Sequence, residues 1–310
     1  MSIQEFKSAS REEWRELRRH YIGGSDAAAV VGMNKFTSAY ELWCIKTGKK
    51  PEFEGNLATE VGTYLEDFVA GKFTEQTGKK VRRNNRSLVN DKYPWAIANI
   101  DREIVGEDAG LEIKTTSALN LKSFKNGEYP ENYYVQCMHY LAITNKKKWH
   151  LAVLIGNKEL KLFTIVRDED EIKALMNAER DFWALVKADT PPAPDGSESA
   201  SEAISAVYPE SNDTCVDLGG FNADLCIIAN CDNQIKELKQ TRDEAANRIK
   251  AFMGEAGRGE SEKFRVSWKT VNSSRFDAIR FAGEHPELAE EIGKYYKHTT
   301  SRAFKISAIN

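Results

Sequence analysis

Residues 96–115, AIANIDREIVGEDAGLEIKT, form two strand-like segments joined by a polar turn that contains Gly106. Because alternate residues of a strand share a face, Glu112 and Lys114 are expected to point the same way. Asp101 lies on the first segment, where a hairpin-like return would bring it opposite Glu112. Two carboxylates beside an ammonium group can hold a divalent cation and position a water, as phosphodiester hydrolysis requires. The alternative is a surface hairpin with a cross-strand ion pair.

Size and composition predict a soluble, cytoplasmic protein. The chain has 310 residues, no apolar run long enough to span a membrane, and no signal-peptide core at its N-terminus. Its five cysteines are scattered and lack metal-binding spacing, which predicts free thiols. The formal net charge of −3 argues against a general polyanion binder but allows DNA contact in a locally basic groove.

The chain before these strands is expected to be mainly helical. Capping residues and apolar periodicity predict helices over 11–20, 27–31, 38–47 and 56–77. Ser25 or Asp26 is expected to cap the second of these helices. Glu66 lies at the edge of the apolar face of the fourth, so its carboxylate is expected beside the core.

The following elements predict a layered α/β domain. They are strands over 81–89, 95–104 and 110–115, a helix from Pro130, a hairpin over 149–155 and 159–166, and a helix over 168–187. Tyr133, Gln136 and Tyr140 fall on one side of the helix that starts at Pro130. The Gly156-Asn157 pair is a strong hairpin signal.

Composition changes after about residue 190. We expect three parts, a first domain at 1–190, a Pro- and Ser-rich linker at 191–214 and an α+β accessory domain at 215–310. An alternating 3,4 spacing of apolar residues from Asn222 to about Gly254 predicts a long helix. This helix carries either a coiled-coil seam or the buried face of an ordinary amphipathic helix. Short strands are expected around Phe264–Trp268 and Phe304–Ile306.

The order helix, strand, strand, helix resembles the PD-(D/E)xK nuclease core, a restriction-endonuclease-like α/β fold with a mixed sheet flanked by helices. Its site residues on successive elements would be Glu66, Asp101, Glu112, Lys114 and Gln136. The dipeptide Asn99-Ile100 before Asp101 departs from the name-giving motif. Leu111–Thr115 match its second half.

Four segments in order are similar to the YqaJ-like viral recombinases, phage exonucleases related to the lambda-type exonuclease. They are IGGSDAAAVVGMNKFTSAYELWCIKTGK (22–49), GTYLEDFVAGKF (62–73), DAGLEIKTTS (108–117) and YYVQCMHYLAITNKKKWHLAVLIG (133–156). This resemblance, over roughly residues 10–185, implies a metal-dependent 5′→3′ exonuclease on double-stranded DNA ends. It would leave 3′ single strands for an annealing recombinase, within a homo-oligomeric ring, often a trimer.

The resemblance also implies a role for each core residue. Metal ligands would be the carboxylates of Glu66, Asp101 and Glu112 and the carbonyl of Ile113. Oxygen ligands suit Mg²⁺, with Mn²⁺ as a substitute, rather than zinc. Lys114 would orient the attacking water or help to deprotonate it. Gln136 would lie beside this lysine or the scissile phosphate.

Contacts to DNA or its 5′-phosphate are expected from two clusters and one tyrosine. The residues are Arg18, Arg19 and Ser25 near the N-terminus, the run Arg82, Arg83 and Arg86, and Tyr140. Ser25 as a simple helix cap and the arginine run as a solvated edge strand remain the alternatives.

Two other functions stay open at this point. One is an endonuclease or repair nuclease with the same core. The other is a non-enzymatic module that binds DNA ends or docks a partner through a relic site. The accessory domain has no identifiable chemistry, and oligomerisation, partner docking or DNA contact would each suit it.

Overall fold

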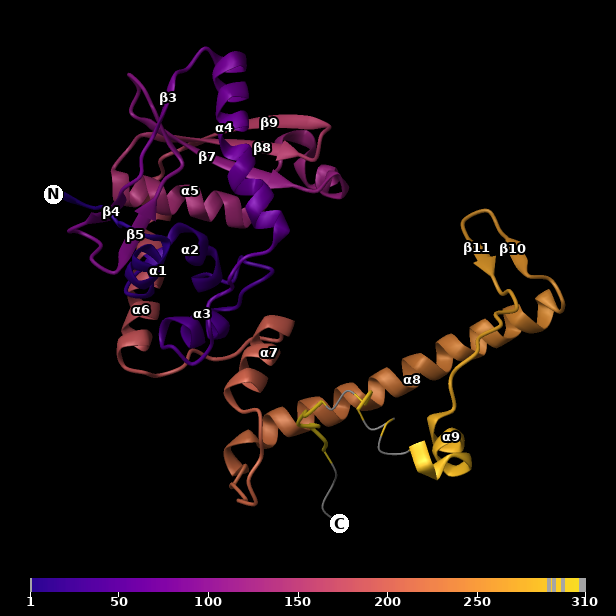
Figure 1. Ribbon diagram of the computed structural model, residues 1–310. Coiled ribbons are helices and arrows are strands. Elements are labelled where there is room, and N and C mark those ends of the chain that lie inside the picture. The colour runs from indigo at the N-terminus through magenta and orange to yellow at the C-terminus, as the bar shows by residue number, and fades with distance from the viewer. Residues whose placement is uncertain (1, 289–290, 292–293, 297–298, 307–310) are drawn as a thin grey trace. The chain divides into compact units, whose positions relative to one another are not determined.

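The computed structural model describes residues 2–288, 291, 294–296 and 299–306 (Figure 1). The chain divides into two compact units, unit 1 at residues 1–208 and unit 2 at residues 209–310.

A five-stranded mixed sheet is the centre of unit 1. Its strands, in order across the sheet, are β3 (Val81–Arg83), β6 (Arg102–Ile104), β7 (Ala109–Thr116), β8 (Lys148–Ile155) and β9 (Glu159–Val166). β7 and β8 pair in parallel, and the other neighbours pair antiparallel. The expected mixed α/β fold and the β8–β9 hairpin are therefore confirmed.

A second sheet lies in the same unit. Its order is β1 (Ile3–Phe6), β4 (Ser87–Asn90), β5 (Ala96–Asn99) and β2 (Ile22–Gly23). The expected continuous strands over 81–89 and 95–104 are wrong, because each is divided between the two sheets. The first breaks at a turn in which Asn84 Oδ1 accepts a hydrogen bond from the Arg86 amide at 3.0 Å, a typical Asx turn. The second breaks at Ile100–Asp101, where the chain passes from β5 to β6.

Helices α4 (Leu57–Thr77) and α5 (Glu131–Thr144) pack on opposite faces of the five-stranded sheet (Figure 1). The other helical elements of unit 1 are α1 (Arg11–Arg19), α2 (Gly24–Val30), α3 (Ala39–Lys46), the 3₁₀ segment η1 (Ala118–Gly127), α6 (Glu169–Lys187) and α7 (Glu198–Val207). Phe73 of α4 packs in one cluster with Leu111 and Ile113 of β7. Leu141 of α5 packs in another cluster with Leu151 of β8. Alternate strand residues thus fill two cores on opposite faces.

Two local expectations for unit 1 differ from the structure. Helix α2 starts at Gly24, three residues earlier than expected, because the Asp26 carboxylate accepts a hydrogen bond from the Gly23 amide at 2.9 Å. The expected linker over 191–214 contains α7, and Ala200 and Ala203 of α7 are buried in a cluster with α3. The linker was predicted because the segment is rich in Pro and Ser, but its alanines allow α7 to pack closely on α3.

Unit 2 is built around one long helix. Its elements are η2 (Gly219–Phe221), α8 (Asn222–Met253), β10 (Arg258–Glu260), β11 (Arg265–Ser267), α9 (Ala278–Glu284) and η3 (Pro286–Leu288). The expected long helix is confirmed, and β11 lies within the expected strand at 264–268. The expected strand at Phe304–Ile306 is wrong, because no ladder partner pairs with it among the described residues. None of the described helices is long and apolar enough to cross a bilayer.

Candidate active site

Strand β7 presents Glu112 and Lys114 on the same face, as expected. Lys114 Nζ lies 2.7 Å from Glu112 Oε1, and Glu112 is buried. Leu111, which precedes Glu112, and Ile113, which lies between Glu112 and Lys114, point to the other face and pack against α4. The period of the strand therefore separates a polar face from an apolar one.

Helix α5 closes over this polar face. Gln136 Nε2 donates to Glu112 Oε1 at 2.7 Å and to the Tyr140 hydroxyl oxygen at 2.9 Å. The Tyr140 hydroxyl in turn donates to the Asn99 carbonyl at 2.9 Å, at the end of β5. A Cβ at Gly24 would lie 2.6 Å from the Tyr140 ring, so only glycine allows this close approach. The buried network holds the Glu112 carboxylate in one orientation.

Asp101 lies beside Glu112 at the bend between β5 and β6. Its Oδ2 accepts a hydrogen bond from the Ile113 amide at 2.8 Å. Burial and the nearby Glu112 carboxylate raise the pKa of Asp101 to about 8, although Lys114 and the Ile113 amide act in the opposite direction. Two carboxylates held this close repel one another unless a cation or a shared proton intervenes.

Lys114 stays protonated in this environment. Burial alone would lower the pKa of Lys114, but the adjacent Glu112 carboxylate outweighs it and raises the pKa above its usual value. The ammonium group also lies 5.5 Å from the centre of the Tyr133 ring, a cation–π contact. A lysine held as a cation can orient a water or stabilise negative charge, and it is a poor proton acceptor.

Glu66 reaches the site from α4. Its Oε2 lies 3.6 Å from Nη1 of the buried Arg102. Burial and the neighbouring Asp101 carboxylate raise the pKa of Glu66, and Arg102 partly offsets this. Glu66 therefore belongs to the same electrostatic group as Asp101.

One pocket of about 230 Å³ collects these side chains. Its lining residues are Trp14, Arg18, Gly23, Gly24, Ser25, Glu66, Asn99, Asp101, Glu112, Ile113, Lys114, Gln136 and Tyr140. All the expected catalytic residues, together with Arg18, Ser25 and Tyr140, are thus brought together from α1, α2, α4, α5, β7 and the connection between β5 and β6.

The donor set fits a hard divalent cation held by two carboxylates. Glu112 Oε2 is buried without a hydrogen-bond partner, and the strong Asp101–Glu112 repulsion would be relieved by positive charge. Within the described residues, however, no three His, Cys, Asp or Glu side chains are grouped closely enough to hold a metal by themselves. The expected metal site with three carboxylates, Glu66, Asp101 and Glu112, is therefore not formed in this structure. Mg²⁺ commonly takes one or two carboxylates and completes its shell with water and substrate phosphate.

A second polar group borders the pocket on the N-terminal side. Arg18 Nη2 donates to Ser25 Oγ at 3.0 Å and lies 3.4 Å from Asp26 Oδ1. Lys46 Nζ lies 2.7 Å from the other Asp26 oxygen. Burial alone would raise the pKa of Asp26, but Lys46 and Arg18 lower it to about 2. Lys46 and Arg18 thus neutralise the negative charge of Asp26. Arg18 and Ser25 also line the pocket, where they can contact a bound group.

The other expected DNA-contacting arginines lie outside this pocket. Arg19 pairs with Glu16 on its own helix at 3.3 Å. Arg82 and Arg83 pair with Glu103 at 2.6 Å and Asp67 at 3.0 Å. Arg86 pairs with Glu5. The three arginines of the run line a separate groove of about 440 Å³, together with Lys7, two asparagines and the carboxylates of Glu5 and Glu103.

Three features of the site were not predicted from the sequence. Trp14 Nε1 donates to Asn99 Oδ1 at 3.0 Å, and the Arg18 guanidinium stacks 4.8 Å from the Trp14 ring centre. The i, i+4 spacing of Trp14 and Arg18 on α1 was the available signal for this contact. The third, Arg102, carries no signal, because its burial depends on tertiary packing.

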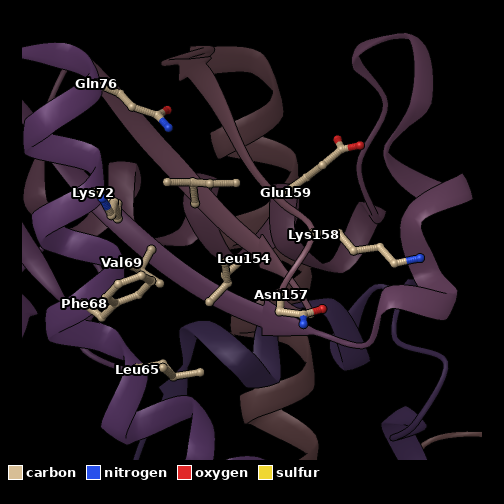
Figure 2. Close-up of a pocket in the computed structure, with 11 residues that line it drawn as sticks. Leu65, Phe68, Val69, Lys72, Gln76, Leu154, Asn157, Lys158 and Glu159 are labelled. Atoms are coloured by element: carbon tan, nitrogen blue, oxygen red, sulfur yellow. The ribbon is translucent and has the colours of Figure 1, made fainter.

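A larger pocket of about 410 Å³ lies between α4 and the β8–β9 turn (Figure 2). Figure 2 shows Phe68, Val69 and Leu154 around it, whereas Lys158 and Glu159 extend away. Its lining is mainly apolar and contains none of the residues of the polar pocket. Its lining offers no paired carboxylates for hydrolysis.

His139 is not part of the chemistry. It is fully buried, with Nδ1 2.7 Å from Glu179 Oε1 and Nε2 3.0 Å from the Ile97 carbonyl. These contacts join α5 to α6 and β5, which is a structural role.

The chain is similar in sequence to a known protein family and to a bacterial protein. The sequence profile of the YqaJ-like viral recombinase domain matches residues 13–147. A protein of Bacillus subtilis (strain 168), described as uncharacterized protein YqaJ, is 39% identical over 307 residues, covering 97% of this chain and 95% of the relative.

Solved structures with a partial likeness include an alkaline exonuclease from Laribacter hongkongensis. It is 21% identical, covers 57% of this chain and 93% of its own, and has a TM-score of 0.48. A phage-related exonuclease from Haemophilus somnus 129PT is 15% identical, covers 59% and 91%, and has a TM-score of 0.38.

Proposed function

Because the chain belongs to the YqaJ-like viral recombinase family, we propose that it is a divalent-metal-dependent nuclease acting on the ends of double-stranded DNA. At each duplex end it would degrade the strand that terminates in 5′ there, and it would leave the complementary strand as a 3′ single-stranded overhang. The main support is the buried Glu112 carboxylate, bound by Lys114 and Gln136 and facing Asp101 in one pocket.

Asp101 and Glu112 would hold Mg²⁺ or Mn²⁺, with the Ile113 carbonyl and Glu66 as further oxygen groups. The ion would supply Lewis-acid polarisation of a phosphate oxygen and a more acidic water. The unpaired Glu112 Oε2 and the raised pKa of Asp101 support this assignment, since both are costs that positive charge would remove.

Lys114 would orient the attacking water and stabilise charge on the phosphate. In the hydrolysis the water oxygen bonds to phosphorus, one P–O ester bond breaks, and the departing oxygen takes up a proton. A lysine that stays protonated suits charge stabilisation better than proton abstraction. Gln136 would fix the Glu112 carboxylate through the amide contact at 2.7 Å.

Arg18 and Ser25 would receive the 5′-terminal phosphate. Arg18 is already oriented by Trp14 and Ser25, so little side-chain entropy is lost when an anion binds. The groove lined by Arg82, Arg83 and Arg86 would contact the DNA backbone farther from the site. An annealing recombinase as partner, and a ring assembly around DNA, would complete the recombination reaction.

The decisive experiment compares a linear duplex with a 5′-phosphate, the same duplex with a 5′-hydroxyl, and a closed circle, each with and without Mg²⁺. We expect rapid loss of a 5′ label from the phosphorylated duplex with Mg²⁺ only, and an intact circle. Glu112→Gln serves as the inactive control. Degradation of the circle at the same rate would instead indicate an endonuclease. DNA binding without any cleavage would indicate a module with a relic site.

A further inference from the structure

Helix α8 leaves a long apolar surface exposed. No residue from Asn222 to Met253 is buried. The side chains of Ile235, Leu238 and Phe252 are 62%, 70% and 93% exposed. Contiguous apolar surface on a soluble protein usually marks a contact site rather than a solvated face.

These residues form a single stripe, which we call the α8 seam. Its members, at alternating spacings of three and four, are Ile228, Cys231, Ile235, Leu238, Arg242, Ala245, Ile249 and Phe252. The opposite side of the helix carries Asn233, Gln240 and Asn247. A 3,4 repeat with a polar back is the pattern of helices that pair along their length.

The described residues of unit 2 cover little of this seam: Ile228 and Ala245 are half-buried, and the other members are exposed. None of the described residues from 209 onward is buried, and the hairpin β10–β11 and helix α9 leave Ile249 and Phe252 exposed. A unit of this size is marginally stable unless it buries apolar surface. The surface that α8 needs must therefore come from outside the described part of unit 2.

We propose that two copies of the chain pair through their α8 seams in antiparallel orientation, centred near Gln240. The single charged member of the seam sets the direction. In a parallel pair Arg242 would face Arg242 of the partner subunit, which places two like charges together inside the contact. In the antiparallel pair Arg242 lies opposite a leucine, the residue at position 238, and its aliphatic stem packs there while the guanidinium reaches water.

The same antiparallel register matches the remaining seam positions. Positions 235 and 245 face one another, as do 231 and 249, and 228 and 252. Each layer then combines a larger side chain with a smaller one or with another apolar group, which favours interdigitation. Such an isologous contact is self-complementary, as a two-fold dimer requires.

The size of the contact predicts modest affinity. The seam from Ile228 to Phe252 is about 36 Å long at the helical rise of 1.5 Å per residue. A facing strip about 10–12 Å wide gives on the order of 400 Å² per helix, in the range of weak and transient interfaces. Association is therefore expected to depend on protein concentration in the micromolar range.

Cysteine cross-linking tests the direction in the full-length chain. The exposed Cys215 and Cys226 are first replaced by serine, while native Cys231 and the buried Cys44 and Cys137 are kept. In this background Ile249→Cys places a thiol opposite Cys231 of the other copy. Under a mild added oxidant we expect a covalent dimer with Ile249→Cys and very little without it.

Two cross-linking results would contradict the antiparallel pair. An efficient Cys231–Cys231 cross-link in the parent background would show a parallel pair and overturn the proposal. Absence of a cross-link in both, even at high micromolar protein, would overturn it as well and would point to packing within one chain. The readout does not depend on nuclease activity, so it can fail while the proposed function holds.

A second measurement follows the mass by light scattering against concentration. Leu238→Asp on the seam should abolish the concentration-dependent doubling, whereas Asn233→Asp on the opposite side makes a similar charge change and should leave it intact. If both variants behave like the unmodified chain, α8 is not the contact. Any assembly through unit 1 would persist in both variants, so the experiment distinguishes it from pairing through α8.

Discussion

Unit 1 and unit 2 differ in how far they bury their apolar side chains. Unit 1 buries Trp149, Trp43 and Phe73 almost completely, one in each of three clusters. The described part of unit 2 buries none, although α8 has comparable large apolar residues. Unit 1 therefore holds rigid side-chain geometry, as hydrolysis requires, whereas unit 2 presents surface for recognition. If this division holds, matched substitutions in the two units should have very different effects.

The largest effect is expected from removing the Glu112 charge. Glu112→Gln keeps the shape and both hydrogen-bonding partners but removes the carboxylate that would hold the cation. The rate of cleavage of an end-labelled duplex in Mg²⁺ should fall about a thousandfold or more, comparable with loss of a key electrostatic group in other enzymes.

A matched variant in unit 2 provides the control. Glu237→Gln makes the same chemical change on α8, and its cleavage rate should stay within about twofold of the unmodified chain. A large loss from Glu237→Gln would break the division, because unit 2 would then take part in the chemistry.

Two leucine truncations compare the packing directly. Leu141→Ala in α5 removes a fully buried side chain and should lower the free energy of unfolding of unit 1 by about 2–5 kcal/mol. Leu238→Ala removes a side chain that is 70% exposed, and it should change the stability of unit 1 by less than ~0.5 kcal/mol. Urea unfolding followed by tryptophan fluorescence measures both at low protein concentration. Equal effects would mean that α8 stabilises unit 1.

A smaller effect is expected at Asp26, where charge is buried inside unit 1. Lys46 and Arg18 outweigh burial and hold the pKa of Asp26 at about 2, below its ordinary value of 3.8. The ionised form therefore adds stability above about pH 4 that is lost as pH falls from 3.8 towards 2. Asp26→Asn should cost about 2 kcal/mol at pH 7.

The pH dependence separates this pair from a packing effect. Near pH 2 the difference between Asp26→Asn and the unmodified chain should largely disappear. Asp181→Asn, at an exposed ion pair, should cost less than ~1 kcal/mol at either pH. A cost for Asp26→Asn that is the same at both pH values would show that the charge does not matter.

The smallest effect on folding is expected in the arginine run. Arg83 and Asp67 form an exposed pair, so Arg83→Ala should change stability by less than ~1 kcal/mol. If Arg83 contacts the DNA backbone, the same variant should reduce the salt dependence of DNA binding by about one phosphate contact. An unchanged salt dependence would leave Arg83 as a solvated edge-strand residue.

Local patterns in the sequence predicted the parts of the fold that depend on a single element. Strand alternation placed Glu112 and Lys114 on one face, and Gly156-Asn157 predicted the hairpin between β8 and β9. Apolar spacing predicted α8, since a helical period can be read from one segment alone.

Features that depend on distant segments could not be predicted in this way. The passage of the chain between two sheets at Ile100–Asp101 depends on which strands are neighbours. The packing of α7 depends on a complementary surface at α3. The contact of Trp14 with Asn99 joins positions far apart in the sequence, so neither residue signals it locally.

The crossing between β5 and β6 has a mechanical consequence for Asp101. This residue stands where one sheet ends and the other begins, whereas Glu112 belongs wholly to the five-stranded sheet. The Ile113 amide of β7 donates to Asp101 Oδ2, so the end of the second sheet is tied to the strand that carries Glu112. The spacing of the two carboxylates is therefore set by the crossing itself, and a change that displaced β5 at this point would alter the site without replacing either carboxylate.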